Sequence, residues 1–133
     1  MIKSAHETKK EVIMGVFKVK ETKTGHVFHL VAGNGETIGT SEVYTTKSAC
    51  LGGVESVRKN AVAAKIEDQV AGENITNPKF EIYLDKAKKF RFRLKASNGE
   101  IILASEGYAS KDGCKNGIES VRKNAPKAKV EEV

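Results

Sequence analysis

The strongest constraint on the fold is that most of the chain is one sequence unit written twice. Residues 55–61 return unchanged as residues 119–125, and two shorter motifs also recur. The recurring motifs are Asn34-Gly35-Glu36 with Asn98-Gly99-Glu100, and Ser41-Glu42-x-Tyr44 with Ser105-Glu106-x-Tyr108. A unit of about 50 residues buries only a modest part of its surface and is marginally stable alone. We therefore expect the two copies to share one sheet and one core, as the subunits of a symmetric dimer do.

Each copy has the pattern of three strands, a helix and a final strand. The second strand alternates apolar and polar residues, and Asn-Gly, which favours tight hairpins, follows it at once. Thr46 and Ser110 can each cap a helix, and Pro126 stops the second helix. The expected strands are 16–20, 26–32, 36–40 and 65–69 in the first copy, and 80–84, 90–96, 100–104 and 129–133 in the second. The expected helices begin near 46 and 110 and end near 60–61 and 124–125.

Two stripes run along each expected helix. An apolar stripe, which should lie on the sheet, consists of Cys50, Val54, Val57 and Ala61, repeated as Cys114, Ile118, Val121 and Ala125. A ridge of small residues runs beside it and consists of Ala49, Gly53, Ser56 and Asn60, repeated as Gly113, Gly117, Ser120 and Asn124. A glycine inside a helix costs roughly 1 kcal/mol relative to alanine, so its return in both copies suggests a packing reason. We infer that the two helices pack side by side through these ridges, about an approximate two-fold axis.

The chain of 133 residues is long enough for one compact domain. We expect residues 1–14 to be a flexible polar tail, 15–69 the first βββαβ repeat, 70–78 a linker and 79–133 the second repeat. No stretch approaches the roughly 18 apolar residues of a membrane span. The first residues also lack the apolar run of a secretory signal, so we expect a cytoplasmic protein.

The two cysteines, Cys50 and Cys114, occupy equivalent places in the two copies. In a cytoplasmic chain such a pair is more often two buried thiols than a disulfide. Two cysteines without clustered histidines do not make a four-ligand zinc site. The sequence also lacks a Ser-His-Asp, paired-carboxylate or phosphate-loop pattern. We therefore expect neither an enzyme nor a bound metal or cofactor.

The motifs of the two copies, taken together, resemble a known family. Both copies carry Asn-Gly-Glu, then Ser-Glu-x-Tyr, then a helix that reads Cys-x-x-Gly-(Ile/Val)-Glu-Ser-Val-Arg-Lys-Asn-Ala. This combination resembles the YegP-like family of small uncharacterised bacterial proteins, over residues 15–69 and 80–133. The resemblance implies paired βββαβ motifs that form one sheet and swap their C-terminal strands. It implies no established activity, substrate, cofactor or catalytic residue.

The predicted fold is therefore α+β. Two tandem βββαβ repeats share one antiparallel sheet, two helices pack on one face of it, and the C-terminal strands are swapped.

The polar residues that both copies keep are the first place to look for a site. Lys47 and Arg58 share one flank of the first helix, as Lys111 and Arg122 do in the second, and an anion could bind there. The structural alternative is stronger, because Glu55 can pair with Arg58 along the helix and the long stems can cover the edge of the core.

A second candidate site is the basic segment of the second copy. Its residues are Lys86, Lys88, Lys89, Arg91, Arg93 and Lys95. A basic strand face can follow a phosphate backbone, but single-strand binders place aromatic side chains on that same face, and here they point the other way. The default is a solvated face. The matching face of the first copy holds Val27 and Val31, which favours contact with another protein or a second chain.

Two functional hypotheses follow. The first is a non-catalytic binding or structural module, a monomer with an internal two-fold, whose partner is a protein. The second is weak, salt-sensitive binding of nucleic acid or another polyanion through Lys86 to Lys95, which the net charge of +6 permits.

Overall fold

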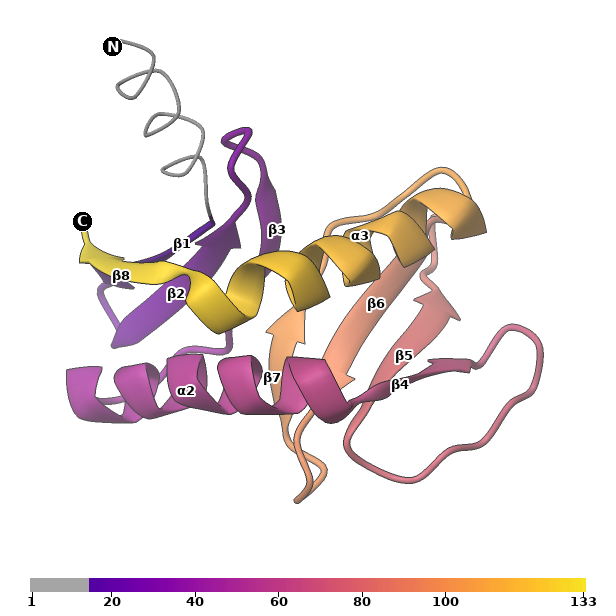
Figure 1. The fold of residues 1–133 in the computed structure, drawn as a ribbon, viewed down its shortest axis with the longest axis horizontal. Helices are drawn as coiled ribbons and strands as arrows, with labels where there is room; N and C mark the ends of the chain where they lie inside the picture. Colours follow the sequence, from indigo (N-terminus) through magenta and orange to yellow (C-terminus); the bar gives the residue numbers. More distant parts are fainter. Residues whose placement is uncertain (1–14) are drawn as a thin grey trace, which may run out of the picture.

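The computed structural model describes residues 15–133 as one eight-stranded mixed sheet with both helices on one face (Figure 1). The expected tail, residues 1–14, lies outside the described residues. The first repeat contains β1 (Val16–Glu21), β2 (His26–Val31), β3 (Thr37–Thr40), α2 (Lys47–Ala63) and β4 (Lys65–Asp68). The second contains β5 (Lys79–Leu84), β6 (Phe90–Lys95), β7 (Ile101–Ala104), α3 (Lys111–Asn124), the short 3-10 helix η1 (Ala125–Lys127) and β8 (Lys129–Glu132).

The local signals of the sequence place these elements correctly. The Thr46 hydroxyl accepts a hydrogen bond from Ala49 N at 3.0 Å, and Ser110 caps α3 in the same way. In the two Asn-Gly hairpins only the glycines take a positive φ, 90° at Gly35 and 87° at Gly99. The first helix runs on to Ala63, past its expected end, because no proline follows it as Pro126 follows α3.

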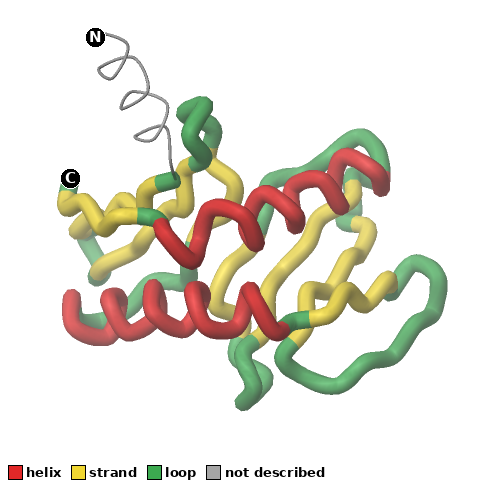
Figure 2. Tube along the Cα trace, in the orientation of Figure 1, coloured by secondary structure: helices red, strands yellow, loops and turns green. Residues whose placement is uncertain are grey.

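The two repeats exchange their last strands. The sheet order is β4-β5-β6-β7-β3-β2-β1-β8, so β4 of the first repeat lies beside β5 of the second, and β8 lies beside β1. Figure 2 shows each helix crossing the sheet before its chain enters the far edge. The expected fold class and the swap are confirmed.

The sheet is mixed, however, and the expectation of a wholly antiparallel sheet is wrong at both edges. The pairs β1–β8 and β4–β5 are parallel. Because β3 and β7 are antiparallel neighbours, every strand of one repeat is reversed relative to its counterpart in the other. The last strand of each repeat pairs with the first strand of the other repeat, β4 with β5 and β8 with β1, and in both pairs the two strands run in the same direction.

One aliphatic and aromatic core lies between the sheet and the helices. The rings of Phe17 and Phe28 meet edge to face at 5.6 Å, and those of Phe80 and Phe92 meet at 6.0 Å. All four rings are fully buried, as are the apolar stripes of both helices. The strand pairing that joins the two halves of the sheet is short, since β3 and β7 pair only through Thr40 and Ala104. The exchanged strands and the shared core therefore supply most of the connection between the repeats.

The ridge of small residues does not form a helix–helix interface, so that expectation is wrong. A Cβ added at Gly53 would lie 2.7 Å from Cζ of Tyr44 and 3.1 Å from Cε2 of Phe28. A Cβ at Gly117 would meet the second tyrosine, Tyr108, in the same way. Each glycine thus makes room for a tyrosine of its own repeat, and this tyrosine defines the candidate site.

Candidate functional site

The Ser-Glu-x-Tyr segment places a tyrosine against the start of each helix. Ser41 Oγ accepts a hydrogen bond from Phe28 N at 2.9 Å and donates one to Glu42 O at 2.7 Å. Tyr44 and His26 then exchange two backbone hydrogen bonds, each of 2.7 Å. The segment is thereby fixed along β2 although it lies outside the strand.

The second copy repeats this arrangement. Ser105 bonds to Phe92 N at 2.9 Å and to Glu106 O at 2.8 Å, and Tyr108 pairs with Phe90 through the backbone. The rings of Tyr44 and Tyr108 stack on the core rings of Phe28 and Phe92, with 6.3 Å between centroids in both cases. Both tyrosines are therefore held by the core and are half-buried.

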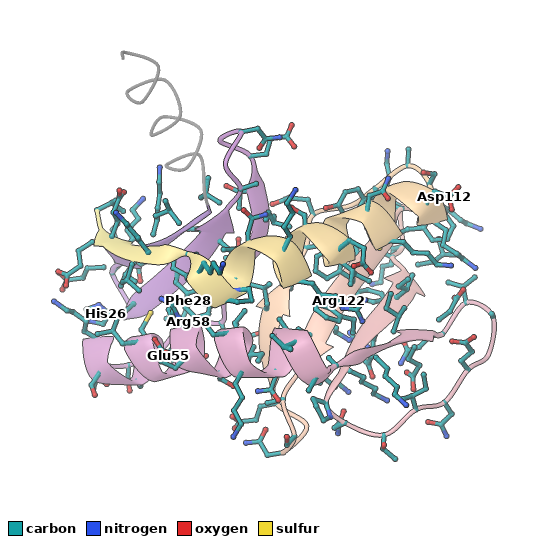
Figure 3. The ribbon with its side chains drawn as sticks, in the orientation of Figure 1. His26, Phe28, Glu55, Arg58, Asp112 and Arg122 are labelled. Atoms are coloured by element: carbon teal, nitrogen blue, oxygen red, sulfur yellow. The ribbon has the colours of Figure 1, made fainter. Side chains whose placement is uncertain are left out.

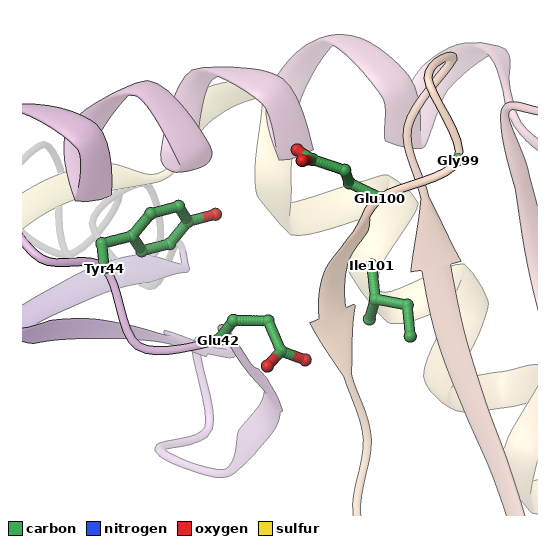
Figure 4. A pocket seen from close by; sticks show the side chains of 5 residues that line it. All are labelled: Glu42, Tyr44, Gly99, Glu100 and Ile101. Carbon is green, nitrogen blue, oxygen red and sulfur yellow. The ribbon is translucent and has the colours of Figure 1, made fainter.

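A hairpin of the other repeat completes each site. The β6–β7 hairpin approaches Tyr44 and leaves a hollow of 470 Å³, which we call the Tyr44 groove. It is lined by Glu42, Tyr44, Gly99, Glu100 and Ile101. In Figure 4 the Tyr44 hydroxyl and the carboxyls of Glu42 and Glu100 project toward the same open space. One groove thus contains groups from both repeats.

The equivalent Tyr108 groove lies between α3 and the β2–β3 hairpin and has a volume of 200 Å³. Its lining includes Tyr108, Gly117, Glu36, Thr37 and Ile38. Further hollows extend along each helix opposite the tip of the same hairpin, past Ser56, Lys59 and Asn60 on α2 and past Ser120, Lys123 and Asn124 on α3. The two grooves are thus related by the internal two-fold.

Burial and nearby ionisable side chains affect both tyrosine hydroxyls. Burial raises the pKa of Tyr44, and the neighbouring ionisable groups of Cys50, Glu100 and Glu42 raise it further. Burial likewise raises the pKa of Tyr108, and the neighbouring ionisable groups of Cys114, Glu36 and Glu106 raise it further. The Tyr44 groove is lined by a glutamate of each repeat, Glu42 and Glu100, whereas of Glu36 and Glu106 only Glu36 lines the Tyr108 groove. Within residues 15–133 none of the four glutamates forms an ion pair with a lysine or arginine.

The lysines of the expected helix-flank anion site contact the swapped strands. Lys47 Nζ lies 2.9 Å from a carboxylate oxygen of Glu132 in β8, and Lys111 Nζ lies 2.7 Å from Asp68 in β4. The hydrogen bond from Lys111 lowers the pKa of Asp68 below its ordinary value, although burial opposes this. Each lysine thus joins the helix of one repeat to the last strand of the other.

The arginines of that expected site also bridge the repeats, and Figure 3 labels both near the space between the helices. Arg122 donates from its Nη2 to Ala64 O at 2.7 Å, and Arg58 donates from Nη1 to Pro126 O at 3.2 Å. Their guanidinium carbons lie 5.5 Å from the ring centre of Phe80 and 5.4 Å from that of Phe17. All four basic side chains therefore have protein partners, and the anion site stays a prediction.

The basic segment of the second repeat divides into two parts. In β6, Arg91 lies 2.6 Å from Asp85, while Arg93 and Lys95 lie 2.6 and 3.1 Å from Glu81. The lysines of the β5–β6 hairpin, Lys86, Lys88 and Lys89, are exposed and have no carboxylate partner within residues 15–133. Lysines of the hairpin, rather than arginines of the strand, are thus available to an anion.

The outer face of the first repeat exposes little apolar surface. Val27 and Val31 are only 9% and 8% exposed. Val27 lies opposite Lys20 of β1, and Val31 lies between Val16 of β1 and Thr37 of β3. The predicted apolar contact surface requires these two valines to be exposed. They are buried, so this prediction is wrong.

Both cysteines are fully buried free thiols, which confirms that part of the sequence interpretation. Burial raises the pKa of Cys50, and burial together with the charge of Asp68 raises that of Cys114 to about 11. Residues 15–133 contain no group of three or more His, Cys, Asp or Glu side chains that could hold a metal ion. No helix in this part of the chain is long and apolar enough to cross a membrane.

Asn-Gly-Glu and Ser-Glu-x-Tyr were identified from the sequence as recurring motifs, but neither Glu36 nor Glu100 was assigned to a site. Asn-Gly-Glu was explained as a turn, which accounts for the asparagine and glycine only: the Asn98 side chain accepts from Glu100 N, and Gly99 takes the positive φ. The glutamate side chain has no part in the turn. Its return in both copies was the signal that could have marked it as part of a site.

Comparison with known proteins agrees with the fold. The family model described as a domain of unknown function (DUF1508) matches residues 21–68 and 85–132, once in each repeat. A UPF0339 protein of Treponema denticola is 71% identical over 55 residues, which are 41% of this chain and 95% of that protein. The UPF0339 protein in the ptx operon 5′ region of Stutzerimonas stutzeri is 43% identical over 121 residues, which cover 90% of this chain and 96% of that one.

Two solved structures have the same fold. The solution structure of yegP from E. coli, a protein of unknown function, has a TM-score of 0.73 and 35% identity and covers 90% of this chain and 92% of its own. The UPF0339 protein SO3888 of Shewanella oneidensis has a TM-score of 0.72 and 32% identity over 90% and 91% of the two chains. With matched repeats, whole-length relatives and a shared fold, the chain belongs to the YegP-like (UPF0339) family of uncharacterised proteins, as a member with two tandem repeats.

Proposed function

We propose that the protein is a non-catalytic binding module, monomeric and cytoplasmic, and that its ligand sites are the Tyr44 and Tyr108 grooves. The observation that carries the proposal is where the residues kept in both copies lie. Glutamate of the hairpin, tyrosine of the Ser-Glu-x-Tyr segment and glycine of the helix recur in both copies and meet at the grooves. The glycine and the tyrosine ring also pack against each other, but the exposed glutamate side chain needs no such agreement for folding alone.

The outer face of the sheet supports the proposal by contrast. Arg91, Arg93 and Lys95 of the second repeat stand where the first has Val27, His29 and Val31. A function carried out by both repeats therefore fits the grooves better than it fits this face.

The chemistry of the grooves favours binding over catalysis. A general base works best when its pKa is near the working pH, whereas burial and neighbouring charge raise the pKa of Tyr44 and of Tyr108 above the ordinary 10.0. The thiols of Cys50 and Cys114 are fully buried, and a nucleophilic cysteine needs an accessible thiolate.

A screen of small fragments of mixed charge, followed by ¹⁵N NMR, tests the proposal. We expect the hits to shift backbone amides of Gly99 and Glu100 in one groove and of Gly35 and Glu36 in the other. The proposal is contradicted if the hits cluster on the outer face of the sheet, or if no fragment shifts a groove amide.

The second candidate function is weak binding of nucleic acid or another polyanion by the basic segment. The specific observation in its favour is that Lys86, Lys88 and Lys89 are exposed on one hairpin, which suits salt-sensitive phosphate contact. Fluorescence anisotropy with short single- and double-stranded DNA and RNA, at low and physiological salt, tests it. Replacing the three hairpin lysines by glutamate should abolish binding, while Arg91→Gln/Arg93→Gln should leave most of it. Absence of binding at low salt overturns this candidate.

A further inference from the structure

We propose that the outer edge of β8 is an interaction surface for a partner protein. The partner contributes an extended segment that pairs with β8 as an additional strand and carries a basic side chain opposite Glu131. No residue of β8 lines the Tyr44 groove or the Tyr108 groove, so the inference goes beyond the proposed function. Its evidence is the equivalent edge of β4, the exposed backbone of β8 and the charge of Glu131.

The edge of β4 shows how this fold holds an extended segment. Because β4 and β5 are parallel, the linker has to return from the end of β4 to the start of β5, and Figure 1 shows it running back beside β4. The Asp68 N–H donates a hydrogen bond to the Glu73 carboxylate at 2.9 Å. The Ile75 N–H donates to the Glu67 carboxylate, and Lys79 Nζ donates to Ile75 O at 2.8 Å. The linker therefore binds both the backbone and the outer side chains of this edge.

The strand β8 is the counterpart of β4 in the second repeat, and its edge is open. All four residues of β8 are exposed, whereas Glu67 and Asp68 of β4 are buried. The Val133 N–H donates to Val19 O in β1, so the preceding N–H, that of Glu132, points away from β1. Because β8 is the last strand of the sheet, this N–H faces no neighbouring strand of residues 15–133. Such an edge can pair with an extended chain.

The charge of the edge specifies the partner. In β4, the Glu67 carboxylate lies 2.8 Å from Lys79 Nζ. In β8, Glu131 stands at the equivalent position, but Val16 takes the place of Lys79. Within residues 15–133 Glu131 forms no ion pair. A lysine or arginine of the incoming strand, opposite Glu131, supplies the charge that Lys79 supplies to Glu67.

A second copy of the chain fits this edge less well than a basic segment does. In an antiparallel pair, residues whose N–H groups face the partner strand lie opposite each other. The register that pairs all four residues of β8 with a second β8 therefore places Glu131 opposite the same residue of the second copy. Like charges directly opposite each other are destabilising. Val130 is an exposed apolar residue whose side chain points to the other face of the strand, so alternating basic and apolar residues match this edge.

Titration of the full chain with two peptides, followed by ¹⁵N NMR at physiological ionic strength, tests the proposal. The peptides are Thr-Lys-Val-Lys-Val-Thr and Thr-Glu-Val-Glu-Val-Thr, both acetylated and amidated. We expect the lysine peptide to shift the amides of Val130 and Glu132 and to bind at least about tenfold more tightly than the glutamate peptide. The amides of Ile66 and Asp68 in β4 should stay still. The proposal is overturned if β8 does not shift, if β4 shifts equally, or if the two peptides bind equally.

N-methylation of the lysine peptide distinguishes strand pairing from simple attraction between charges. The N–H groups of a strand face its two sides in alternation, so only one alternate set can bond to β8. Methyl groups on that set should abolish binding, and methyl groups on the other set should leave it. Equal effects of the two sets contradict strand pairing and overturn the proposal.

Matched variants of β8 complete the test. Glu132→Pro removes the outward N–H, which an edge strand tolerates, whereas Glu132→Ala removes only the side chain. The Glu132→Pro variant should bind the lysine peptide at least about tenfold more weakly than the Glu132→Ala variant. Glu131→Gln should weaken binding about threefold, as expected for an exposed ion pair. Equal binding by the two Glu132 variants overturns the proposal. Shifts of the β8 amides on dilution of the protein alone would assign the edge to a second copy and overturn it as well.

Discussion

Arg122 offers a quantitative test of how the two repeats hold together. Its guanidinium donates to the Ala64 carbonyl at the end of the other repeat's helix, at 2.7 Å, and lies over the ring of Phe80. It also pairs with exposed Glu119 on its own helix at 2.6 Å. We consider the substitution Arg122→Met, because methionine retains much of the apolar stem and removes only the charged fork.

The three contributions add to a measurable loss. A hydrogen bond from a charged group to a carbonyl stabilises by about 1.5–3 kcal/mol. A cation over an aromatic ring adds about 0.5–1 kcal/mol, and an exposed ion pair three residues apart adds about 0.3–0.5 kcal/mol. We expect Arg122→Met to lower the free energy of unfolding by about 2–4 kcal/mol.

The pseudo-symmetric Arg58 is the matched comparison. Its bond to Pro126 O is longer, at 3.2 Å. Its buried Nε lies 3.2 Å from the Glu55 carboxylate in a direction that makes no hydrogen bond within the described residues. Arg58→Met should therefore cost less, about 1–2 kcal/mol.

Urea unfolding followed by circular dichroism measures both variants, with Lys123→Met as the surface control. With a denaturant slope of about 2 kcal/mol/M, Arg122→Met should lower the unfolding midpoint by about 1–2 M in a single transition. The control should change the free energy of unfolding by less than about 0.5 kcal/mol. A loss below about 0.5 kcal/mol for Arg122→Met, or a larger loss for Arg58→Met, would refute the reasoning.

Two further predictions use matched positions. Gly53→Ala should destabilise by about 1–2 kcal/mol because its Cβ meets Tyr44, whereas Gly52→Ala, in open space on the same helix, should stabilise by up to about 1 kcal/mol; thermal unfolding distinguishes them. Burial raises the pKa of Glu67, but hydrogen bonds from Lys79, Ile75 N and Gln69 outweigh it and lower the pKa from 4.5 to about 2. A lowered carboxyl pKa stabilises the fold above pH 4.5, and this contribution is lost as the pH falls toward 2. Glu67→Gln should therefore remove part of the stability difference between pH 5 and pH 2.5, while Glu131→Gln, at the equivalent exposed position, should not.

Features that depend on a single copy could be predicted from the sequence. Thr46 and Ser110 cap the helices through contacts three residues away, and the stripe of Cys50, Val54, Val57 and Ala61 follows from helical periodicity. Even the existence of a shared sheet follows from the marginal size of one repeat.

Features that depend on contacts between the copies could not be predicted. Nothing in the spacing of one repeat shows that Lys111 meets Asp68, or that Arg122 reaches the Ala64 carbonyl. Gly53 was assigned to a helix–helix contact because a helical wheel identifies small residues but not what lies against them. The grooves were missed for the same reason, since Glu100 comes within reach of Tyr44 only when two repeats are folded together.

The three tyrosines of the chain allow a direct test of the central claim that both grooves are ligand sites. Tyr44 and Tyr108 line the two grooves. Tyr83 lies outside them, with its ring centre 4.4 Å from the guanidinium carbon of Arg93, and serves as an internal control. Fluorine NMR of the 3-fluorotyrosine-labelled protein, titrated with the hits of the fragment screen, measures all three at once. The account predicts that the Tyr44 and Tyr108 resonances shift with saturation while Tyr83 stays still. Equal shifts of all three resonances, or no shift of the two groove tyrosines, would contradict it.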